Sequence, residues 1–263
     1  MAPEPTPERD AAPERGPTPD RDLIPDPGAP LPEGADKTRS VQAMFDVIAP
    51  RYDLVNRVMT FRMDVGWRRR TVGSLGLTPG SVVVDLACGT GDLARDLAER
   101  RLVPVGVDLS FGMLAAAPVA FPRLQADGSA LPLADASVDG ATCGFALRNF
   151  TDLDATLSEL ARVIRPGGRM ALLEVAEPPN PLMRFGHGIY FNKVVPKVGG
   201  LLSDGDAYAY LPRSVAYLPD PEEMVAAIGR TGFTHVRRTL LSGGIAQLLT
   251  GTRAGSPSRS RAA

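Results

Sequence analysis

Residues 81–94 of the chain read SVVVDLACGTGDLA, an apolar run that contains an acid, Asp85, and leads into two closely spaced glycines, Gly89 and Gly91. An apolar run of this length favours a buried strand, and the glycines favour a tight turn into a helix. A turn of that kind brings bare backbone close to a ligand. The stretch therefore predicts the first strand, turn and helix of a ligand-binding domain, and its ligand must tolerate an acid beside the glycines.

Strands and helices continue to alternate after this stretch. The expected strands cover residues 82–86, 103–109, 123–126, 138–145, 169–175, about 234–240 and about 245–250. The expected helices cover residues 92–101, 113–117, 153–164 and 221–231. This order predicts an α/β, Rossmann-like fold with a seven-stranded, mostly parallel sheet and helices on both faces. Ligands of such sheets bind at the carboxyl ends of the strands.

The remaining segments differ in composition. Ten of the 25 prolines fall among the first 32 residues, which predicts a disordered, acidic tail over residues 1–36. Residues 37–70 form an amphipathic helical segment, in which Pro50 forces a break or a kink. Residues 177–215 interrupt the alternation and hold three of the five tyrosines, so we expect a cover inserted over the ligand-binding end of the sheet. The Ser/Arg-rich residues 254–263 are expected to form a second disordered tail.

The composition also excludes several classes of function. With a net charge of −1 and no basic stretch interleaved with aromatic residues, no nucleic-acid partner is expected. Cys88 and Cys143 lie in apolar segments, which indicates a reducing setting rather than a disulfide framework. His187 and His235 have no partner at ligand spacing, so no metal site is expected. No apolar stretch reaches the roughly 20 residues of a membrane-spanning helix.

The glycine turn formally matches a dinucleotide fingerprint. Residues 89–94 read GTGDLA, which fits G-x-G-x-x-A. In dinucleotide proteins a pyrophosphate lies on this turn, and Asp85 and Asp92 would repel that anion. S-adenosylmethionine carries an ammonium and a sulfonium and no phosphate, so nearby carboxylates favour it. We therefore expect S-adenosylmethionine as the cofactor; the alternative is an NAD-linked reductase, which tight NADH binding without S-adenosylmethionine binding would establish.

Two further acids follow expected strands. Asp108 ends the second strand, where a carboxylate can accept hydrogen bonds from both ribose hydroxyls, a feature shared with NAD proteins. Asp127 follows the third strand, where it can accept from the adenine amino group. Together with Asp85 they place acids at successive strand ends of one sheet, which favours a cofactor site over scattered surface residues.

Several motifs resemble those of known proteins. VVVDLACGTGDLA, VGVDLS, ADGSALPL and RVIRPGG together resemble class I S-adenosylmethionine-dependent methyltransferases. MFDVIAPRYDLVNRVMT, GFALRNF, LLEVAEP and AYAYLPRSV are similar to the demethylmenaquinone/ubiquinone C-methyltransferase family, and look most like its menaquinone branch. The resemblance covers about residues 37–253 and implies one methyltransferase domain over that range.

The resemblance implies roles for the residues of these motifs. The cofactor would be held by the glycine turn and the strand-end acids, namely Asp85, Gly89, Thr90, Gly91, Asp108, Asp127 and Gly128. The acceptor ring and the transferred methyl would lie near Tyr52, Asp53, Arg148 and Asn149. The implied reaction carries a methyl group to a ring carbon of demethylmenaquinol. We hypothesise that Arg148 stabilises the developing phenolate, while Asp53 or a water held by Asn149 takes the proton.

The chain departs from the family pattern at three positions. A family glycine is replaced by Arg62, a family arginine by Val65 and a family histidine by Leu249. These changes leave the cofactor residues intact and concern the acceptor side. Two alternatives therefore stay open: another lipophilic acceptor, such as a ubiquinone precursor or a polyketide, and a cofactor-binding module without catalysis.

The isoprenoid tail of the implied acceptor resides in lipid. The cover at 177–215 and the helix at 39–55 could form an apolar mouth that faces the bilayer. We therefore expect a cytoplasmic protein in peripheral contact with the inner face of the membrane. The oligomeric state does not follow from the sequence.

Overall fold

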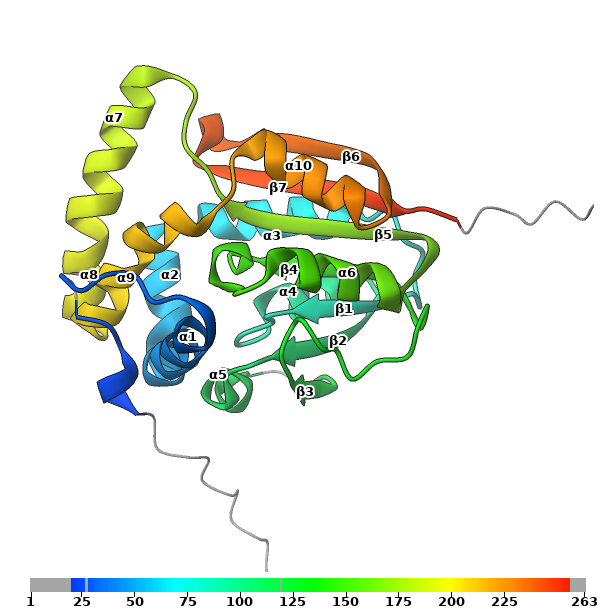
Figure 1. Ribbon diagram of the computed structural model, residues 1–263, viewed down its shortest axis with the longest axis horizontal. Helices are drawn as coiled ribbons and strands as arrows, with labels where there is room; N and C mark the ends of the chain where they lie inside the picture. The colour runs from blue at the N-terminus through cyan, green and yellow to red at the C-terminus, as the bar shows by residue number, and fades with distance from the viewer. Residues whose placement is uncertain (1–19, 27, 119, 256–263) are drawn as a thin grey trace, which may run out of the picture.

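The computed structural model describes residues 20–26, 28–118 and 120–255. A seven-stranded sheet in the order β3-β2-β1-β4-β5-β7-β6 forms its centre (Figure 1). The strands are β1 (Val82–Leu86), β2 (Val103–Asp108), β3 (Arg123–Gln125), β4 (Val138–Gly144), β5 (Ile164–Val175), β6 (Phe233–Leu241) and β7 (Ala246–Arg253). Pairings among β1 to β5 are parallel, whereas β7 runs antiparallel to β5 and β6. The predicted fold class is confirmed, and the strand order reverses between β1 and β4.

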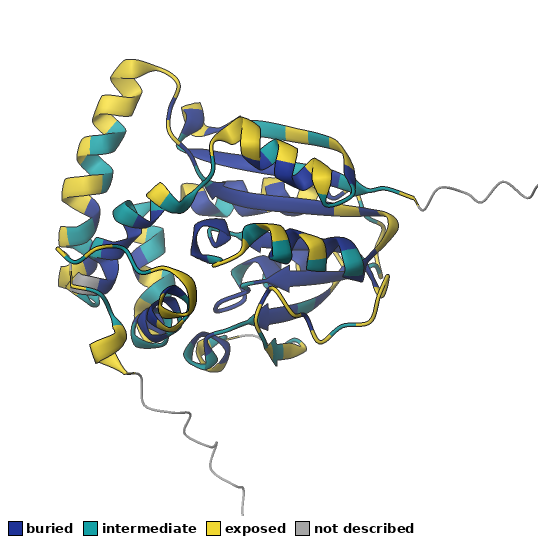
Figure 2. Ribbon diagram, viewed as in Figure 1, coloured by how far each residue is buried: buried dark blue, intermediate teal, exposed yellow. Residues whose placement is uncertain are grey.

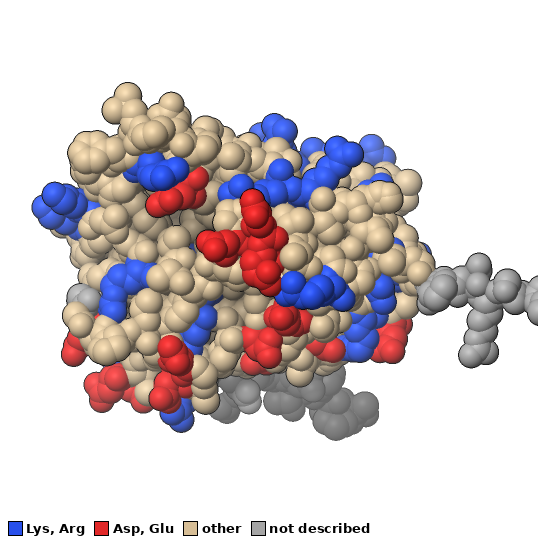
Figure 3. All heavy atoms as spheres, turned by 45° about the horizontal axis from the view of Figure 1, so that its top comes forward, with Lys and Arg blue, Asp and Glu red and all other residues tan. Residues whose placement is uncertain are grey.

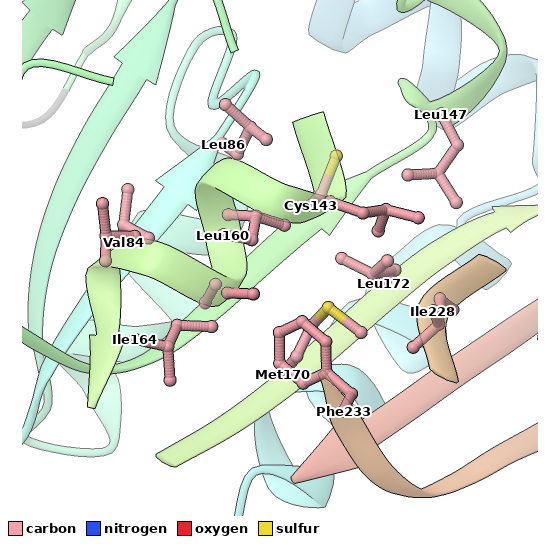
Figure 4. Close-up of a cluster of buried hydrophobic side chains, with 14 of the residues drawn as sticks. Val84, Leu86, Cys143, Leu147, Leu160, Ile164, Met170, Leu172, Ile228 and Phe233 are labelled. Carbon is pink, nitrogen blue, oxygen red and sulfur yellow. The ribbon is translucent and has the colours of Figure 1, made fainter. Parts of the chain in front are cut away.

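Two pairs of helices cover the two faces of this sheet (Figure 1). They are α3 (Met63–Ser74) with α4 (Asp92–Glu99) on one face, and α6 (Leu153–Val163) with α10 (Pro221–Arg230) on the other. Successive β1 side chains point to opposite faces, so Val83 packs with α3 and α4 while Val84 packs with α6. Figure 4 shows the core on the face covered by α6 and α10, which contains Leu160 of α6, Ile228 of α10 and Leu172 of the sheet. Burial on both faces explains the unbroken apolar run that begins the sequence motif.

A layer of helices lies at the carboxyl ends of the parallel strands. It contains α1 (Gly34–Ile48), α2 (Tyr52–Met59), α7 (Pro181–Ile189), α8 (Val195–Leu202) and α9 (Gly205–Ser214), with α5 (Phe111–Ala116) beside α1. The first helix ends at Ile48, and a 3-10 turn over Ala49–Arg51 contains Pro50. A π-helical turn, Tyr190–Val194, joins α7 to α8. A separate small core that includes Met44, Val55 and Tyr208 joins α1, α2 and α9.

The chain ahead of α1 packs on the domain. Arg21 lies 3.1 Å from Asp204 and Arg213 donates a hydrogen bond of 3.2 Å to the Asp26 carbonyl, while the Tyr217 hydroxyl donates to the Pro32 carbonyl. This arrangement differs from the disorder expected for all of residues 1–36. Residues 1–19 of that tail lie outside the described residues, as do residues 256–263 of the C-terminal tail.

The strands match their expected ranges closely, apart from β5. This strand starts at Ile164, which pairs with Val138 ahead of a register shift, and not at the expected Arg169. Among the described residues, no helix combines the length and the apolar character that crossing a membrane requires.

Candidate active site

The glycine turn connects β1 to the first turn of α4 at the reversal of the strand order. Ala87, Gly89 and Gly91 all have positive φ angles, of 51°, 55° and 88°. Glycine takes this conformation without strain, and its lack of a side chain exposes the peptide groups of the turn. The turn borders two cavities, of about 360 and 480 Å³, which share Tyr52, Gly89 and Phe145 among their lining residues.

The smaller cavity, named here the first cavity, lies between α1 and the ends of β2, β3 and β4. Asp108 lies in its wall and accepts hydrogen bonds of 2.8 Å from the backbone N–H groups of Gly89 and Ser110. Burial raises the pKa of the Asp108 carboxyl to about 6, although those two hydrogen bonds act in the opposite direction. The β2 acid is therefore held against the glycine turn, at the edge of the cavity.

Asp127 and Gly128 line the same cavity from the loop after β3. The Asp127 carboxylate accepts from the Ser129 N–H at 2.8 Å and from the Ser129 hydroxyl at 2.7 Å. A Cβ atom at Gly128 would lie 3.1 Å from the Phe150 ring and 3.3 Å from Leu86, so a larger residue would shift the cavity wall. Asp127 and Gly128 thus form part of the wall of the first cavity.

Asn149 also lines the first cavity, and neither its buried Nδ2 nor its buried Oδ1 atom has a hydrogen-bond partner among the described residues. An orphaned amide of this kind costs free energy unless a ligand or water pairs with it. The sequence hypothesis placed Asn149 beside the acceptor, whereas the structure places it in the wall that also holds Asp108 and Asp127.

Asp85 lies at the end of β1, is almost fully buried and lines the larger, second cavity. One carboxylate oxygen accepts a hydrogen bond of 2.8 Å from the Thr142 hydroxyl, and the other has no partner in the part of the chain that the structure describes. Burial raises the pKa of this carboxyl to about 7, and the nearby Asp108 charge adds to the rise. A cationic group of a ligand would satisfy the free oxygen and favour the ionised form.

Arg148 reaches the second cavity from the 3-10 turn Leu147–Asn149 that follows β4. Its guanidinium pairs with the fully buried Glu174 carboxylate at the end of β5, donates 3.1 Å to the Ser214 hydroxyl and donates 2.8 Å to the Phe145 carbonyl. Sequence reasoning missed Glu174. Its signal was an acid within the apolar run ALLEV, at the carboxyl end of the fifth strand.

Tyr52 and Asp53, adjacent in sequence, have different surroundings. Tyr52 lines both cavities, and its ring lies edge-on to Phe45 with 5.9 Å between centroids. Burial raises the pKa of the Tyr52 hydroxyl. The Asp53 carboxylate instead accepts a 2.5 Å hydrogen bond from Thr90 and lies 3.9 Å from Arg57, and Asp53 is not among the residues that line either cavity. Asp53 thus ties α2 to the glycine turn.

The walls of the second cavity are mainly apolar and come from α2, α3 and the α7–α8 segment. Its aromatic lining residues are Tyr52, Phe61, Trp67, Phe145, Tyr190 and Phe191, and its methionines are Met59, Met63 and Met183. At one side it meets a cluster of opposite charges, where Arg68 pairs with Asp64 and lies 3.1 Å from Asp92. Residues 177–215 and 39–55, expected from the sequence to form an apolar mouth, both contribute to this lining, whereas the contributions of Phe61, Met63 and Trp67 were not expected.

The fold and the site together define a class of protein. The strand order, the glycine turn at the reversal point and the acids at the ends of β1 and β2 and after β3 are those of a class I methyltransferase that uses S-adenosylmethionine. The orphaned polar atoms of Asn149 and Asp85 fit a ligand with both polar and cationic groups. The chain belongs to the ubiE/COQ5 methyltransferase family, whose model matches residues 33–253.

Similar proteins agree with this membership. The chain is 42% identical over 224 residues to the ubiquinone/menaquinone biosynthesis C-methyltransferase UbiE of Syntrophotalea carbinolica, covering 82% of this chain and 94% of that protein. It is 43% identical over 222 residues to the demethylmenaquinone methyltransferase of Thermus thermophilus, covering 80% of this chain and all of that protein.

Solved structures show the same fold at lower identity. An S-adenosylmethionine-dependent methyltransferase of Thermotoga maritima matches with a TM-score of 0.57 and 20% identity, covering 81% of this chain and 99% of that chain. Phosphoethanolamine N-methyltransferase 2 of Haemonchus contortus, solved with S-adenosylmethionine, matches with a TM-score of 0.54 and 15% identity, covering 72% of this chain and 52% of that chain.

Proposed function

We propose that this protein methylates a ring carbon of demethylmenaquinol to give menaquinol, the last step of menaquinone biosynthesis. The observation that carries the proposal is the junction of the two cavities: a polar one with strand-end acids opens beside a mainly apolar one with a buried arginine in its wall. The names of the similar proteins support a quinol as the acceptor.

In this proposal the first cavity holds the adenosine part of S-adenosylmethionine. Asp108 accepts from the ribose hydroxyls, while Asp127, Gly128 and Asn149 surround the adenine. The backbone of Gly89, Thr90 and Gly91 lies along the cofactor where the first cavity meets the second. The free oxygen of Asp85 pairs with the cationic amino-acid end of the cofactor. When bound, S-adenosylmethionine supplies an electrophilic methyl group on a positively charged sulfur.

The residues of the second cavity orient the quinol and activate its ring. A ring carbon becomes nucleophilic when the adjacent hydroxyl loses its proton, and such a hydroxyl has a pKa of about 10. The Arg148 guanidinium, fixed by Glu174, lowers that pKa by stabilising the phenolate. Tyr52, which lines both cavities, positions the ring against the methyl group. In-line placement of this kind can contribute about 7–11 kcal/mol.

The two proton acceptors suggested by the sequence differ in their surroundings. Asp53 is bonded to Thr90 and lies outside the lining of both cavities, which argues against it as the base. Asn149 lines only the first cavity, which the proposal gives to the adenosine, so a water held by its amide would not lie beside the quinol either. The proposal therefore leaves the proton to solvent water in the second cavity. The proposal also includes a cytoplasmic protein that touches the inner face of the membrane, where the isoprenoid tail of the acceptor resides.

Quinone profiling of cells that lack the protein tests the substrate. We expect a menaquinone without its ring methyl group to accumulate, and the wild-type gene to restore the methylated form. Restoration by an Arg148→Ala gene would contradict the role of Arg148, and an unchanged quinone profile would contradict the choice of acceptor. Parallel measurement of ubiquinone precursors tests the alternative acceptor.

A further inference from the structure

An exposed apolar stripe runs along α7, the helix that projects beyond the sheet in Figure 1. Leu182 is 80% exposed, Phe185 69% and Ile189 43%. Their spacing of three and four residues places them on one face of the helix. Figure 2 shows exposed residues along most of this helix, in contrast to the buried sheet. Large apolar side chains left in water in this way mark a surface that meets an apolar partner.

The turn between α2 and α3 extends this stripe. Phe61, in that turn, is 71% exposed, and its ring centroid lies 5.7 Å from that of Tyr190, which follows α7 directly. The Tyr190 hydroxyl donates a hydrogen bond of 2.7 Å to the Met59 carbonyl, which fixes the two segments to each other. We name the apolar stripe of α7 together with Phe61 the docking surface.

The docking surface adjoins the second cavity. Phe61 belongs both to this surface and to the cavity lining, and Met183, on α7 beside Leu182, also lines the cavity. A molecule dissolved in an apolar medium against this surface would therefore reach the cavity without crossing water. This continuity ties the surface to the proposed function, on which the following inference rests.

The charges around the surface are mainly basic, although the exposed Glu177 carboxylate lies 3.7 Å from Arg184. Residues 178–203 contain no Asp or Glu, and within them Arg184, Lys193 and Lys197 are exposed. Arg62, beside Phe61, is exposed as well. Figure 3 shows the upper left of the molecule, where α7 lies, as mostly uncharged, with basic groups and an acidic group beside one of them. Apolar side chains interleaved with Lys and Arg match the interface of an anionic bilayer.

We propose that the docking surface binds an anionic lipid bilayer, with Leu182, Phe185 and Phe61 inserted among the acyl chains and the flanking basic residues at the headgroups. A second copy of the chain fits this surface less well. A symmetric dimer through the same face would bring the basic groups of one copy against those of the other.

Flotation of the full chain with lipid vesicles tests the proposal. We expect binding to vesicles of phosphatidylglycerol and phosphatidylcholine that contain no quinone, weaker binding to phosphatidylcholine alone, and a decrease with added salt. The double variant Leu182→Ser/Phe185→Ser should bind at least about tenfold less. Leu240→Ser is the matched control, because Leu240 is a 38% exposed leucine on β6 and should leave binding unchanged.

Two further measurements separate this surface from the methyl-transfer site. The double variant should keep wild-type affinity for S-adenosylhomocysteine and wild-type turnover of a short-chain, water-soluble quinol, which shows that it folds. A double variant that floats like the wild type would overturn the proposal. The proposal would also be overturned if the wild-type chain did not bind anionic vesicles and light scattering showed that it dimerises through this face. That result would not bear on the proposed reaction, which has its own test.

Discussion

The Arg148 guanidinium and the Glu174 carboxylate form a buried ion pair between the end of β4 and the end of β5. The pair has one face in the second cavity, because Arg148 lines that cavity while Glu174 is fully enclosed. A buried charge pair of this kind contributes little net stability, but removal of one partner leaves an uncompensated charge. Glu174 therefore acts as a positioning residue for Arg148.

Glu174→Gln should lower the free energy of unfolding by about 3 kcal/mol and reduce kcat by about tenfold or more. Chemical denaturation and turnover of a soluble quinol measure the two effects. Glu223→Gln is the matched control, since Glu223 pairs with Arg230 at 2.7 Å on the surface and such pairs contribute under about 1 kcal/mol. Equal changes in the free energy of unfolding and in kcat for the two variants would contradict the positioning role.

Asp108→Asn should weaken binding of S-adenosylhomocysteine by about tenfold or more, because hydrogen bonds to a charged acceptor are worth about 1.5–3 kcal/mol. Isothermal titration calorimetry measures this change. Asp135→Asn provides the control, since Asp135 is 80% exposed and pairs only with Arg162 among the described ion pairs. If the Asp108→Asn variant bound S-adenosylhomocysteine as tightly as the wild type does, Asp108 would not be the residue that binds the ribose.

The ligand-free protein should lose stability as the pH rises from about 4 to about 7. Burial raises the folded-state pKa of Asp85 to about 7 and of Asp108 to about 6, whereas an unfolded aspartate titrates near about 3.9. Between these values the folded state binds more protons than the unfolded state, so the free energy of unfolding falls with increasing pH.

Asp85→Asn should flatten this pH dependence, because it removes the group with the higher pKa. Urea denaturation of both proteins at several pH values measures the slopes. Asp135→Asn should keep the wild-type slope. If Asp85→Asn and the wild type lost stability equally between pH 4 and 7, the raised pKa of Asp85 would be wrong.

Arg62→Gly should stabilise the protein by about 1 kcal/mol. Arg62 precedes α3 with φ of 62° and follows Phe61, whose φ is 50°. This left-handed conformation suits the glycine that the family pattern carries here and strains an arginine. Arg62→Ala keeps the strain and serves as the control in thermal and urea denaturation. A loss of stability in Arg62→Gly relative to Arg62→Ala would refute the account of this departure.

The sheet and the cofactor side of the site could be predicted because their signals are local. Val82–Leu86 is apolar except for Asp85, and the glycine turn and the strand-end acids follow directly after their strands. Leu249, where the sequence pattern predicts a departure from the family, is fully buried in the core.

The acceptor side could not be predicted because its contacts join distant segments. Glu174 meets Arg148 across two neighbouring strands, and Asp53 accepts a hydrogen bond from Thr90, which lines the second cavity and lies 37 positions further along the chain. The sequence hypothesis that Asp53 lies near the acceptor finds no support in the lining of either cavity, and the contact that Asp53 makes is the hydrogen bond from Thr90 of the glycine turn.

The position of the transferred methyl group in the product provides the most direct test of carbon methylation. The purified protein is incubated with S-adenosylmethionine labelled in its methyl group and with a short-chain demethylmenaquinol, and the product is examined by mass spectrometry and NMR. We predict that the label is bound to the ring carbon that carried hydrogen in the substrate. A label on a hydroxyl oxygen, or no labelled product from a protein that binds S-adenosylhomocysteine, would contradict the proposed reaction.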